Sequence, residues 1–252
     1  MPKLWFSIYD RTNYTGPEPF FWDTQKIEWA KMVEEHYPVI KNELAEYLKE
    51  HKLESYFNQS MVEKPNTWKT VSLMAWSIEI YRFQKFFPKT NELIRKIPGL
   101  VSASFNLLTP HSHIVPHNGD TNAIYRCHLG LSIPAPLPDC GFKVGDQEIS
   151  WEEGKLLAFT DAHKHEAWNN TDKNRFIFLF DVLRPEYVNR RNLVCSTVMS
   201  SLWGQRRAER YKVLYNVPLW IQSSMIHCLI PPCLAMIKTM NFMGRYFKAF
   251  RY

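Results

Sequence analysis

The chain has few cysteines and no cysteine framework. Its 252 residues include five cysteines, an odd number, and no two of them form a CxxC pair. This spacing argues against a disulfide-stapled secreted domain and against a zinc ribbon. The N-terminal residues also lack the apolar core of a signal peptide, because Asp10 and Arg11 follow Met1 too closely. We therefore expect reduced thiols and a cytoplasmic location.

Acidic residues are almost missing from the C-terminal part of the chain. Between Arg184 and Tyr252 the only acids are Glu186 and Glu209, whereas Lys and Arg recur throughout. A basic surface of this kind suits anionic lipid, nucleic acid, an acidic partner or solvent alone. Of these partners we expect lipid, and no nucleic acid.

A stretch without formal charge, Val213–Ile237, lies inside this basic part. It is long enough to be considered as a membrane span. Pro218 and the pair Pro231-Pro232 should interrupt a helix there, so a clean spanning helix is not expected. We expect peripheral membrane contact through residues 213–252, with basic side chains near anionic head groups. The alternative is a helical pair that packs on the rest of the protein or at a dimer interface.

The remaining composition is that of a folded protein, with 45% hydrophobic and 15% aromatic residues. Apolar residues recur at helical spacing between Thr24 and Phe57, and Pro38 should end one helix there and start another. A short helix is expected over Glu92–Lys96, before Pro98-Gly99. The first part of the chain is therefore predicted to be helical.

After Val101 the pattern changes to short runs with period two, separated by turn residues. The candidate strands are Ala103–Leu108, Ala123–Ile133, Phe142–Val144, Lys155–Phe159, Glu166–Trp168 and Arg175–Val182. They favour a jelly-roll, a mainly β double-sheet barrel with flanking helices. We therefore divide the chain into a helical region that packs on the core (1–100), a β core (101–187) and a basic, apolar helical tail (188–252).

Two of these strands place cations on a face that would line a barrel. Side chains alternate along a strand, so Arg126 and His128 share one face. Arg175 begins a strand whose faces are both largely apolar, which predicts burial between layers. A buried guanidinium needs a carboxylate partner, which it binds in a two-pronged fork. That partner is either a bound ligand or an internal acid, Asp172 or Asp181.

Six of the nine histidines fall between His111 and His165. Non-haem iron oxygenases commonly hold their metal with two His and one carboxylate. A His-x-Asp/Glu spacing puts two such ligands on one side of a strand. His117 is followed by Asn118 and Gly119, and Asp120 comes one residue late. By spacing alone, the carboxylate is missing.

Five motifs, in this order, resemble those of the aspartyl/asparaginyl β-hydroxylase family. They are PHNGDTN (116–122), RCHLGL (126–131), WEEGK (151–155), HEAWN (165–169), and Arg175 followed by Asp181-Val182 and Pro185-Glu186. The resemblance covers about residues 109–187. In this family a Gly characteristically takes the place of the carboxylate, and water can complete the metal shell. Gly119 fits that pattern.

The resemblance implies a double-stranded β-helix, cupin-like, and an iron(II)/2-oxoglutarate-dependent dioxygenase. Such an enzyme couples the oxidative decarboxylation of 2-oxoglutarate to the hydroxylation of an unactivated carbon. It uses Fe(II), 2-oxoglutarate and O2, with ascorbate as the usual reductant in vitro. By motif, His117 and His165 correspond to the metal ligands, and Arg175 to the residue that binds the distal carboxylate of 2-oxoglutarate.

Four further positions correspond to co-substrate residues. Arg126 and His128 are similar to residues beside 2-oxoglutarate, with His128 near its other carboxylate or keto end. Trp68 resembles a Trp of the family's pocket. Asn106 stands where the family often has a Ser that contacts 2-oxoglutarate, so this contact differs from the family pattern.

Other assignments remain open. His111-Ser112-His113 could form a cupin-like pair with His117 as third ligand. Asp120 could reach the metal through a β-bulge. His163 shares a strand face with His165 and is expected to be its neighbour, not a ligand. An acid or amide could steady His165 from outside the metal shell, and the candidates are Asp161, Glu166 and Asn169.

The substrate class also has alternatives. The family includes enzymes that act on Asp or Asn side chains of proteins and others that act on acyl chains of bacterial lipids. The basic, apolar tail favours a lipid acyl chain slightly, and β-hydroxylation of Asp or Asn in a protein, peptide or small molecule is the alternative. A non-catalytic, cupin-like metal-binding module is a further one, against which the complete set His117, His165 and Arg175 argues.

Overall fold

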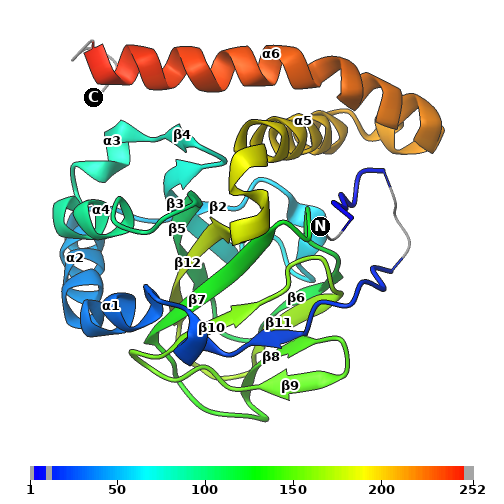
Figure 1. Ribbon diagram of the computed structural model, residues 1–252. Helices are drawn as coiled ribbons and strands as arrows, with labels where there is room; N and C mark the ends of the chain where they lie inside the picture. The colour runs from blue at the N-terminus through cyan, green and yellow to red at the C-terminus, as the bar shows by residue number, and fades with distance from the viewer. Residues whose placement is uncertain (1–2, 10–12, 247–252) are drawn as a thin grey trace.

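Two antiparallel sheets face each other in the computed structural model, which describes residues 3–9 and 13–246 (Figure 1). The larger sheet has, in order, β1 (Phe21–Trp22), β10 (Leu156–Phe159), β7 (Ile124–Ser132), β12 (Arg175–Leu183), β5 (Leu100–Leu108), β3 (Trp68–Ala75) and β2 (Glu54–Ser55), with β4 (Ile78–Glu79) paired to β3. The smaller sheet has the order β6 (Ser112–His117), β11 (His165–Asn169), β8 (Cys140–Val144) and β9 (Gln147–Ile149). Apolar residues of both sheets pack together between them. The predicted fold, a mainly β double-stranded β-helix with flanking helices, is confirmed.

All six predicted strands are present, with their ends shifted by a few residues. β3 and β6 were not among the predicted strands. β6 contains Pro116, which weakens a strand pattern, but β6 is an edge strand and tolerates the missing N–H. β1 to β4 all lie within residues 1–100, so this region extends the larger sheet as well as covering it with helices.

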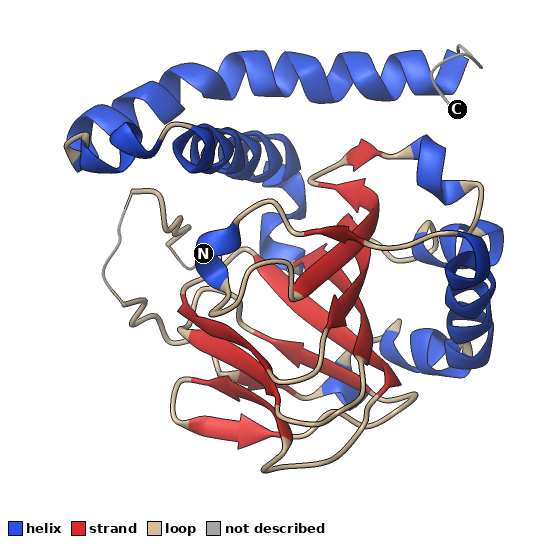
Figure 2. Ribbon diagram, turned by 180° about the vertical axis from the view of Figure 1, so that it is seen from behind, coloured by secondary structure: helices blue, strands red, loops and turns tan. Residues whose placement is uncertain are grey.

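The N-terminal helices cover the outer face of the larger sheet (Figure 2). They are α1 (Ala30–Glu35), α2 (Tyr37–Glu50), α3 (Tyr81–Gln84) and α4 (Pro88–Ile94), with short 3-10 turns η1 (Thr24–Lys26) and η2 (Gln59–Met61). Pro38 lies in the first turn of α2, which confirms the predicted break. Ile40 and Leu44 of α2 join Phe178 and Phe180 of β12 in one buried cluster. Because strand side chains alternate, the other face of β12 points into the space between the sheets.

The C-terminal part is helical, as predicted. It consists of η3 (Pro185–Arg190), α5 (Arg191–Arg210), η4 (Lys212–Asn216) and α6 (Leu219–Tyr246). The expected interruption at Pro231-Pro232 was wrong, because α6 runs through both prolines without a break. Each proline removes one helical hydrogen bond to a carbonyl four residues earlier. Those carbonyls belong to His227 and Cys228, which are exposed, so water can satisfy them.

α6 lies along α5 and reaches β4, as Figure 1 shows. Its Asn241 side chain donates to Ser77 O at 2.6 Å, and Ile237 joins a buried cluster with Val194 and Val198 of α5. Within the described residues, Leu219–Gly244 is the one stretch long and apolar enough, by length and composition, to cross a membrane. One side of that stretch is already packed on the protein.

Candidate metal and co-substrate site

A small cavity of about 50 Å³ lies between the two sheets. All seven predicted site residues line it: His117, His165, Arg126, His128, Arg175, Asn106 and Trp68. Trp68 comes from β3, and the other six come from β5, β6, β7, β11 and β12. The fold therefore brings these residues together, although Trp68 and Arg175 are 107 positions apart in the sequence. The arrangement is a buried pocket with two histidines and two guanidinium groups.

The two predicted metal ligands face each other across neighbouring strands. His117 of β6 and His165 of β11 are paired in register, and their ring centroids are 4.2 Å apart. Each Nδ1 lies 2.8 Å from a backbone carbonyl oxygen, that of Val115 or His163. A carbonyl can only accept, so each Nδ1 carries the proton and each Nε2 keeps its lone pair for a metal.

Both imidazoles are held neutral. Burial lowers the pKa of His165 to about 3, and burial together with the neighbouring His165 lowers the pKa of His117 to about 3. Neutral imidazole is the form that binds a metal ion. The pair is therefore ready to act as two nitrogen ligands at neutral pH.

An acid, Asp161, lies beside the histidines, although it is not at the position after His117 that the His-x-Asp/Glu spacing gives. A Cβ built on Gly119 would come 2.0 Å from Cγ of Asp161, and Asp161 Oδ1 lies 3.8 Å from His165 Nε2. The backbone fixes this placement, because Gly119 N–H donates to Asp161 O and Asp120 N–H donates to Asp161 Oδ2, both at 2.9 Å. The Asp161 carboxylate thus fills the place that a side chain at position 119 would need.

Arg126 is bound by two internal acids. Its Nε and Nη2 donate to the two carboxylate oxygens of Asp181 at 2.8 and 3.0 Å, and Nη1 donates to Asp161 at 2.5 Å. Burial opposes the charge on Arg126, but Asp161 and Asp181 outweigh it and hold the pKa of Arg126 well above its usual value. Arg126 lines the cavity as an already compensated cation.

Arg175 is the opposite case. It is 2% exposed, makes no ion pair with any described residue, and its buried Nε–H has no acceptor. The two internal partners considered for it are engaged elsewhere, Asp181 with Arg126 and Asp172 with His111. Burial lowers the pKa of Arg175 to about 10, and its guanidinium stacks 4.5 Å from the Trp151 ring centroid. A buried cation without an anion predicts an anionic ligand.

His128 has a defined donor toward the cavity. Burial and the nearby Arg175 hold the pKa of His128 well below its usual value, so the ring is neutral. Trp151 Nε1–H donates to His128 Nδ1 at 3.2 Å, which leaves the proton of His128 on Nε2. His128 can therefore donate one hydrogen bond to an oxygen of a ligand.

Trp68 and Asn106 close the other side of the pocket. Trp68 Nε1–H donates to Asn106 Oδ1 at 3.0 Å, and Asn106 Nδ2 donates to Ser104 Oγ at 2.9 Å. Asn106 is thus oriented by its neighbours. The Trp68 ring stacks on Tyr56 with centroids 3.9 Å apart, which fixes the ring as a wall.

His111, His113 and His163 make their side-chain contacts outside the two-histidine centre. His111 is exposed and pairs with Asp172 at 2.8 Å, while His113 lies between Glu63 and Glu166 at 2.9 and 2.8 Å. His163 Nε2 donates to Glu18 O, and its own carbonyl orients His165. Across residues 3–9 and 13–246 no group of three or more His, Cys, Asp or Glu has the geometry of a complete metal site. The His111–His113 arrangement therefore gives no support to the cupin-like ligand set.

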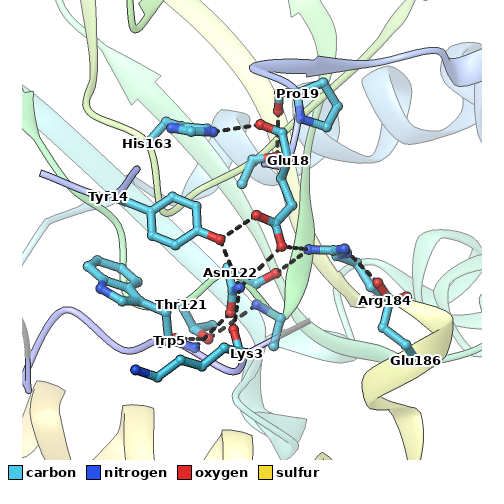
Figure 3. A network of polar contacts seen from close by, with 12 residues as sticks. Lys3, Trp5, Tyr14, Glu18, Pro19, Thr121, Asn122, His163, Arg184 and Glu186 are labelled. Carbon is cyan, nitrogen blue, oxygen red and sulfur yellow. Dashed lines mark hydrogen bonds and ion pairs between the residues drawn. The ribbon is translucent and has the colours of Figure 1, made fainter. Parts of the chain in front are cut away.

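The loop that carries Gly119 is tied to the N-terminal segment by a buried polar network (Figure 3). Asn122 accepts from Trp5 N–H at 2.9 Å, and Thr121 donates to Trp5 O at 2.7 Å. Glu18 accepts from Arg184 Nη1 at 2.7 Å and from the Tyr14 hydroxyl. This network holds Thr121 and Asn122, which follow Gly119 and Asp120 in the chain, against Trp5 and Arg184.

Sequence reasoning did not assign Trp151 or Asp181 to the site. Asp181 shares a strand face with Arg175, so alternation places it on the inner face of β12, but only the register with β7 sets it beside Arg126. Trp151 belongs to a motif that was recognised, but nothing local shows that it touches His128 and Arg175. Its contacts depend on the closure of the two sheets.

Similarity to known proteins covers the part of the chain that forms this site. A family profile described as aspartyl/asparaginyl beta-hydroxylase matches residues 34–185. An ornithine lipid ester-linked acyl 2-hydroxylase from Rhizobium tropici is 36% identical over 172 residues, 66% of this chain and 61% of that protein. Aspartyl/asparaginyl beta-hydroxylase from Homo sapiens is 31% identical over 192 residues, 71% of this chain and 25% of that protein. The matches span less than two thirds of either relative.

A solved structure, HygX from Streptomyces hygroscopicus with nickel and 2-oxoglutarate bound, is similar with a TM-score of 0.40 and 10% identity, over 57% of this chain and 79% of that one. A likeness of this size carries no argument about function. The family profile is the stronger finding, since it spans more than half of the 252 residues and contains the strands that line the cavity. The chain belongs to the aspartyl/asparaginyl beta-hydroxylase family.

Proposed function

We propose that this protein is an iron(II)/2-oxoglutarate-dependent dioxygenase that hydroxylates an unactivated carbon. The observation that carries the proposal is the buried, uncompensated Arg175 in the cavity that His117 and His165 also line. A dicarboxylate that also binds the metal would supply the missing anion and connect the two features. 2-Oxoglutarate, the co-substrate that the family resemblance implies, is such a molecule.

The metal would be held by Nε2 of His117 and His165. Two neutral nitrogen ligands suit iron(II) and leave its charge in place for an anionic co-substrate. The Asp161 carboxylate, beside His165 and against Gly119, would act as a hydrogen-bond acceptor next to the metal ligands. When bound there, iron(II) and 2-oxoglutarate supply the oxygen activation that hydroxylation requires.

The co-substrate would be oriented by three of the lining residues. The Arg175 guanidinium would bind the distal carboxylate in a two-pronged contact and is itself held against Trp151. His128 would donate from Nε2 to an oxygen nearer the metal, since Trp151 occupies its Nδ1. Arg126, fixed by Asp161 and Asp181, would add positive potential without moving. Trp68 and Asn106 would form the opposite wall.

For the substrate we favour a lipid acyl chain. The Rhizobium tropici relative is an ornithine lipid acyl 2-hydroxylase by name, and the exposed apolar side chains of α6 suit a lipid surface. β-Hydroxylation of Asp or Asn in a protein, peptide or small molecule is the second candidate, because the human relative carries that name. A non-catalytic, cupin-like metal-binding module is the third.

We also propose peripheral membrane contact and a cytoplasmic site of action. Exposed apolar residues lie along α6, and Trp220 and Phe242 are 72% and 56% exposed. The opposite side of α6 packs on α5. A helix with one face on protein and one apolar face outward suits the membrane interface better than a crossing. Residues 247–252 of the proposed 213–252 contact segment lie outside the described residues. Flotation with anionic vesicles tests the contact, and equal flotation of wild type and Trp220→Ser would contradict it.

The reaction is tested with purified protein, iron(II), ascorbate and labelled 2-oxoglutarate. We expect succinate in proportion to hydroxylated product when an acyl lipid is supplied, and none from His117→Ala. His111→Ala is the matched control, since His111 is exposed and paired with Asp172. Absence of succinate with lipids, peptides and amino acids alike would overturn the enzymatic assignment. Turnover only with Asp- or Asn-containing peptides would favour the second candidate.

A further inference from the structure

A second, larger cavity adjoins the metal and co-substrate pocket. Its volume is about 430 Å³, within the range of about 300–1,000 Å³ typical of small-molecule sites. The two cavities share five lining residues, Trp68, Asn106, His117, Arg126 and Leu179, whereas His165 lines the smaller one. The larger one also reaches Gly119 and Asp120, and Arg175 does not line it. We refer to it as the α5 cleft.

The α5 cleft has two unlike walls. One wall is the inner face of β3 and β5, where hydroxyl side chains point into the cavity: Thr70, Ser72, Ser102 and Ser104. The facing wall is apolar and comes from α5, from η2 and from the loop before it: Phe57, Met61, Met199, Leu202 and Trp203. The hydroxyls can hydrogen-bond to the carbonyl oxygen of an acyl group, and the apolar wall suits its hydrocarbon chain.

The α5 wall lies outside the part of the chain that the family profile matches. That match ends at residue 185, and α5 spans Arg191–Arg210. The residues around His117 and Arg175 therefore lie within the part that the profile matches, whereas the helix that shapes the larger cavity lies outside it. Such a wall is the expected place for selection of one substrate class.

Two unpaired cations stand on the exposed part of the α5 cleft. Arg206 lies over the Phe57 ring at 5.5 Å and Arg82 over the Phe83 ring at 4.6 Å, and both are exposed. Neither has an ion-pair partner among the described residues, although Glu54 also lines the cleft. Stacking on the rings limits the freedom of the guanidinium groups, so less entropy is lost when they bind an anion.

We propose that the α5 cleft binds the acyl chain of an anionic amphiphile, with its negatively charged head group on Arg206 and Arg82. The acyl carbon to be hydroxylated then lies beside His117 and Asp120, where the two cavities meet. Exposed apolar residues of neighbouring α6 place the cleft near a lipid surface from which such a molecule would come. This inference rests on the proposed function and names the substrate class of that site.

Binding can be measured without turnover, by calorimetry on the full chain with N-dodecanoylglycine below its micellar concentration. N-acetylglycine, which lacks the chain, and dodecyl maltoside, which lacks the charge, are the comparison ligands. We expect N-dodecanoylglycine to bind, N-acetylglycine not to bind, and dodecyl maltoside to bind about tenfold more weakly, the usual effect of losing one charge-assisted contact.

The variants separate the head-group contact from general basicity. Arg206→Gln or Arg82→Gln should weaken N-dodecanoylglycine binding about tenfold and leave dodecyl maltoside binding unchanged. Arg207→Gln is the matched control, because Arg207 is the next residue of α5, is exposed and does not line the cleft. Leu202→Trp should fill the cavity and abolish binding of both amphiphiles. Equal weakening by Arg207→Gln, or no effect of Leu202→Trp, overturns the assignment.

Cross-linking gives a test that does not depend on a variant fold. A dodecanoylglycine with a diazirine at its chain end should label peptides of α5 or η2 in the wild-type protein. Labelling confined to α6 overturns the proposal. 2-Oxoglutarate binding is measured in the same samples and tests the proposed function. Loss of amphiphile binding while 2-oxoglutarate still binds would contradict only the assignment of the α5 cleft. Competition by an Asp-containing peptide, with no binding of N-dodecanoylglycine, assigns the cleft to peptides and also overturns the proposal.

Discussion

The carboxylate of Asp161 occupies the space that a side chain at position 119 would take, with a built Cβ of Gly119 only 2.0 Å from Asp161 Cγ. Asp161 precedes His165 by four residues. The segment before His165 therefore supplies the acid that the motif around His117 lacks. Gly119 is needed here for space, because its neighbour is a buried carboxylate held by backbone hydrogen bonds. Its role is to let Asp161 approach His117 and His165.

Gly119→Ala is therefore expected to destabilise the protein. The methyl group would overlap the Asp161 carboxylate, which Arg126 also binds, so neither group can move freely. Overpacking of this kind costs about 1–3 kcal/mol. Urea unfolding of both proteins, monitored by tryptophan fluorescence, measures the difference in the free energy of unfolding.

A double-mutant cycle identifies the cause. On an Asp161→Ala background the added methyl has room, so Gly119→Ala should cost at least about 1 kcal/mol less than it does in the wild type. Asp161→Ala by itself is expected to be destabilising, because it removes one partner of the buried Arg126. Additive effects of the two changes would contradict the steric explanation.

The histidine pair should account for the binding of divalent metal. Each Nε2 is left free by an Nδ1–H bond to a backbone carbonyl, so His117→Ala and His165→Ala each remove one of two protein ligands. We expect each variant to lose more than about tenfold in affinity for cobalt(II), followed by its visible spectrum, because even residues behind the ligands contribute that much. His113→Ala should bind cobalt(II) like the wild type, and a loss there equal to that of His165→Ala would argue for a different centre.

Arg175→Met separates stability from co-substrate binding. The wild-type side chain is a buried cation without an acceptor for its Nε–H, so an apolar replacement removes a desolvation cost. We expect the ligand-free variant to be as stable as the wild type or more stable, and to lose 2-oxoglutarate binding. Saturating 2-oxoglutarate, at 100 times its Kd, should stabilise the wild type by about 2.7 kcal/mol.

The two effects are measured by thermal unfolding with and without 2-oxoglutarate, in the presence of a divalent metal. Arg126→Met serves as the contrast, since Arg126 is paired with Asp161 and Asp181 and its removal leaves two buried acids facing each other. That variant should be clearly destabilised. Stabilisation of Arg175→Met by 2-oxoglutarate to the wild-type extent would refute the assigned contact.

The sequence was sufficient for the parts of the fold that depend on local periodicity. The alternation around Arg126 and His128 and in Arg175–Val182 predicted β7 and β12, and Pro38 predicted the start of α2. β6 was not predicted, because Pro116 interrupts its strand pattern. The strand forms nevertheless, since β6 is an edge strand and needs no hydrogen bond from position 116. Pro231-Pro232 predicted a helix break that does not occur. The carbonyls that the two prolines leave without a helical donor lie on exposed residues of α6.

Partner choice within the site was beyond the sequence. Asp181 was considered as a partner of Arg175, its neighbour on the same strand face, but it binds Arg126 of the adjacent strand. The register between β12 and β7 decides this, and a long-range register cannot be read from either strand alone. The same holds for Asp161, one of three candidates to steady His165, whose contact with Gly119 depends on how two loops meet.

The Glu18–Arg184 pair predicts a pH dependence of stability. Burial opposes ionisation of Glu18, but hydrogen bonds from Arg184 and Tyr14 outweigh it and lower its pKa below 4.5. A lowered folded-state pKa means that the stabilisation is fully present above 4.5 and is lost as the pH falls through the folded value. At pH 7, Glu18→Gln should therefore be less stable by about 1–3 kcal/mol, the worth of a hydrogen bond to a charged group.

As the pH falls below 4.5 and through the folded-state pKa, that difference should shrink, because the wild-type Glu18 becomes protonated and then resembles the glutamine. Thermal unfolding of both proteins across this range measures the effect. Glu28→Gln is the control, since Glu28 is exposed and should not change the profile. Because the network of Figure 3 holds Thr121 and Asn122, in the loop that follows His117, Glu18→Gln should also weaken cobalt(II) binding at pH 7. A constant stability difference at all pH values would mean that the Glu18 carboxylate contributes shape and not charge.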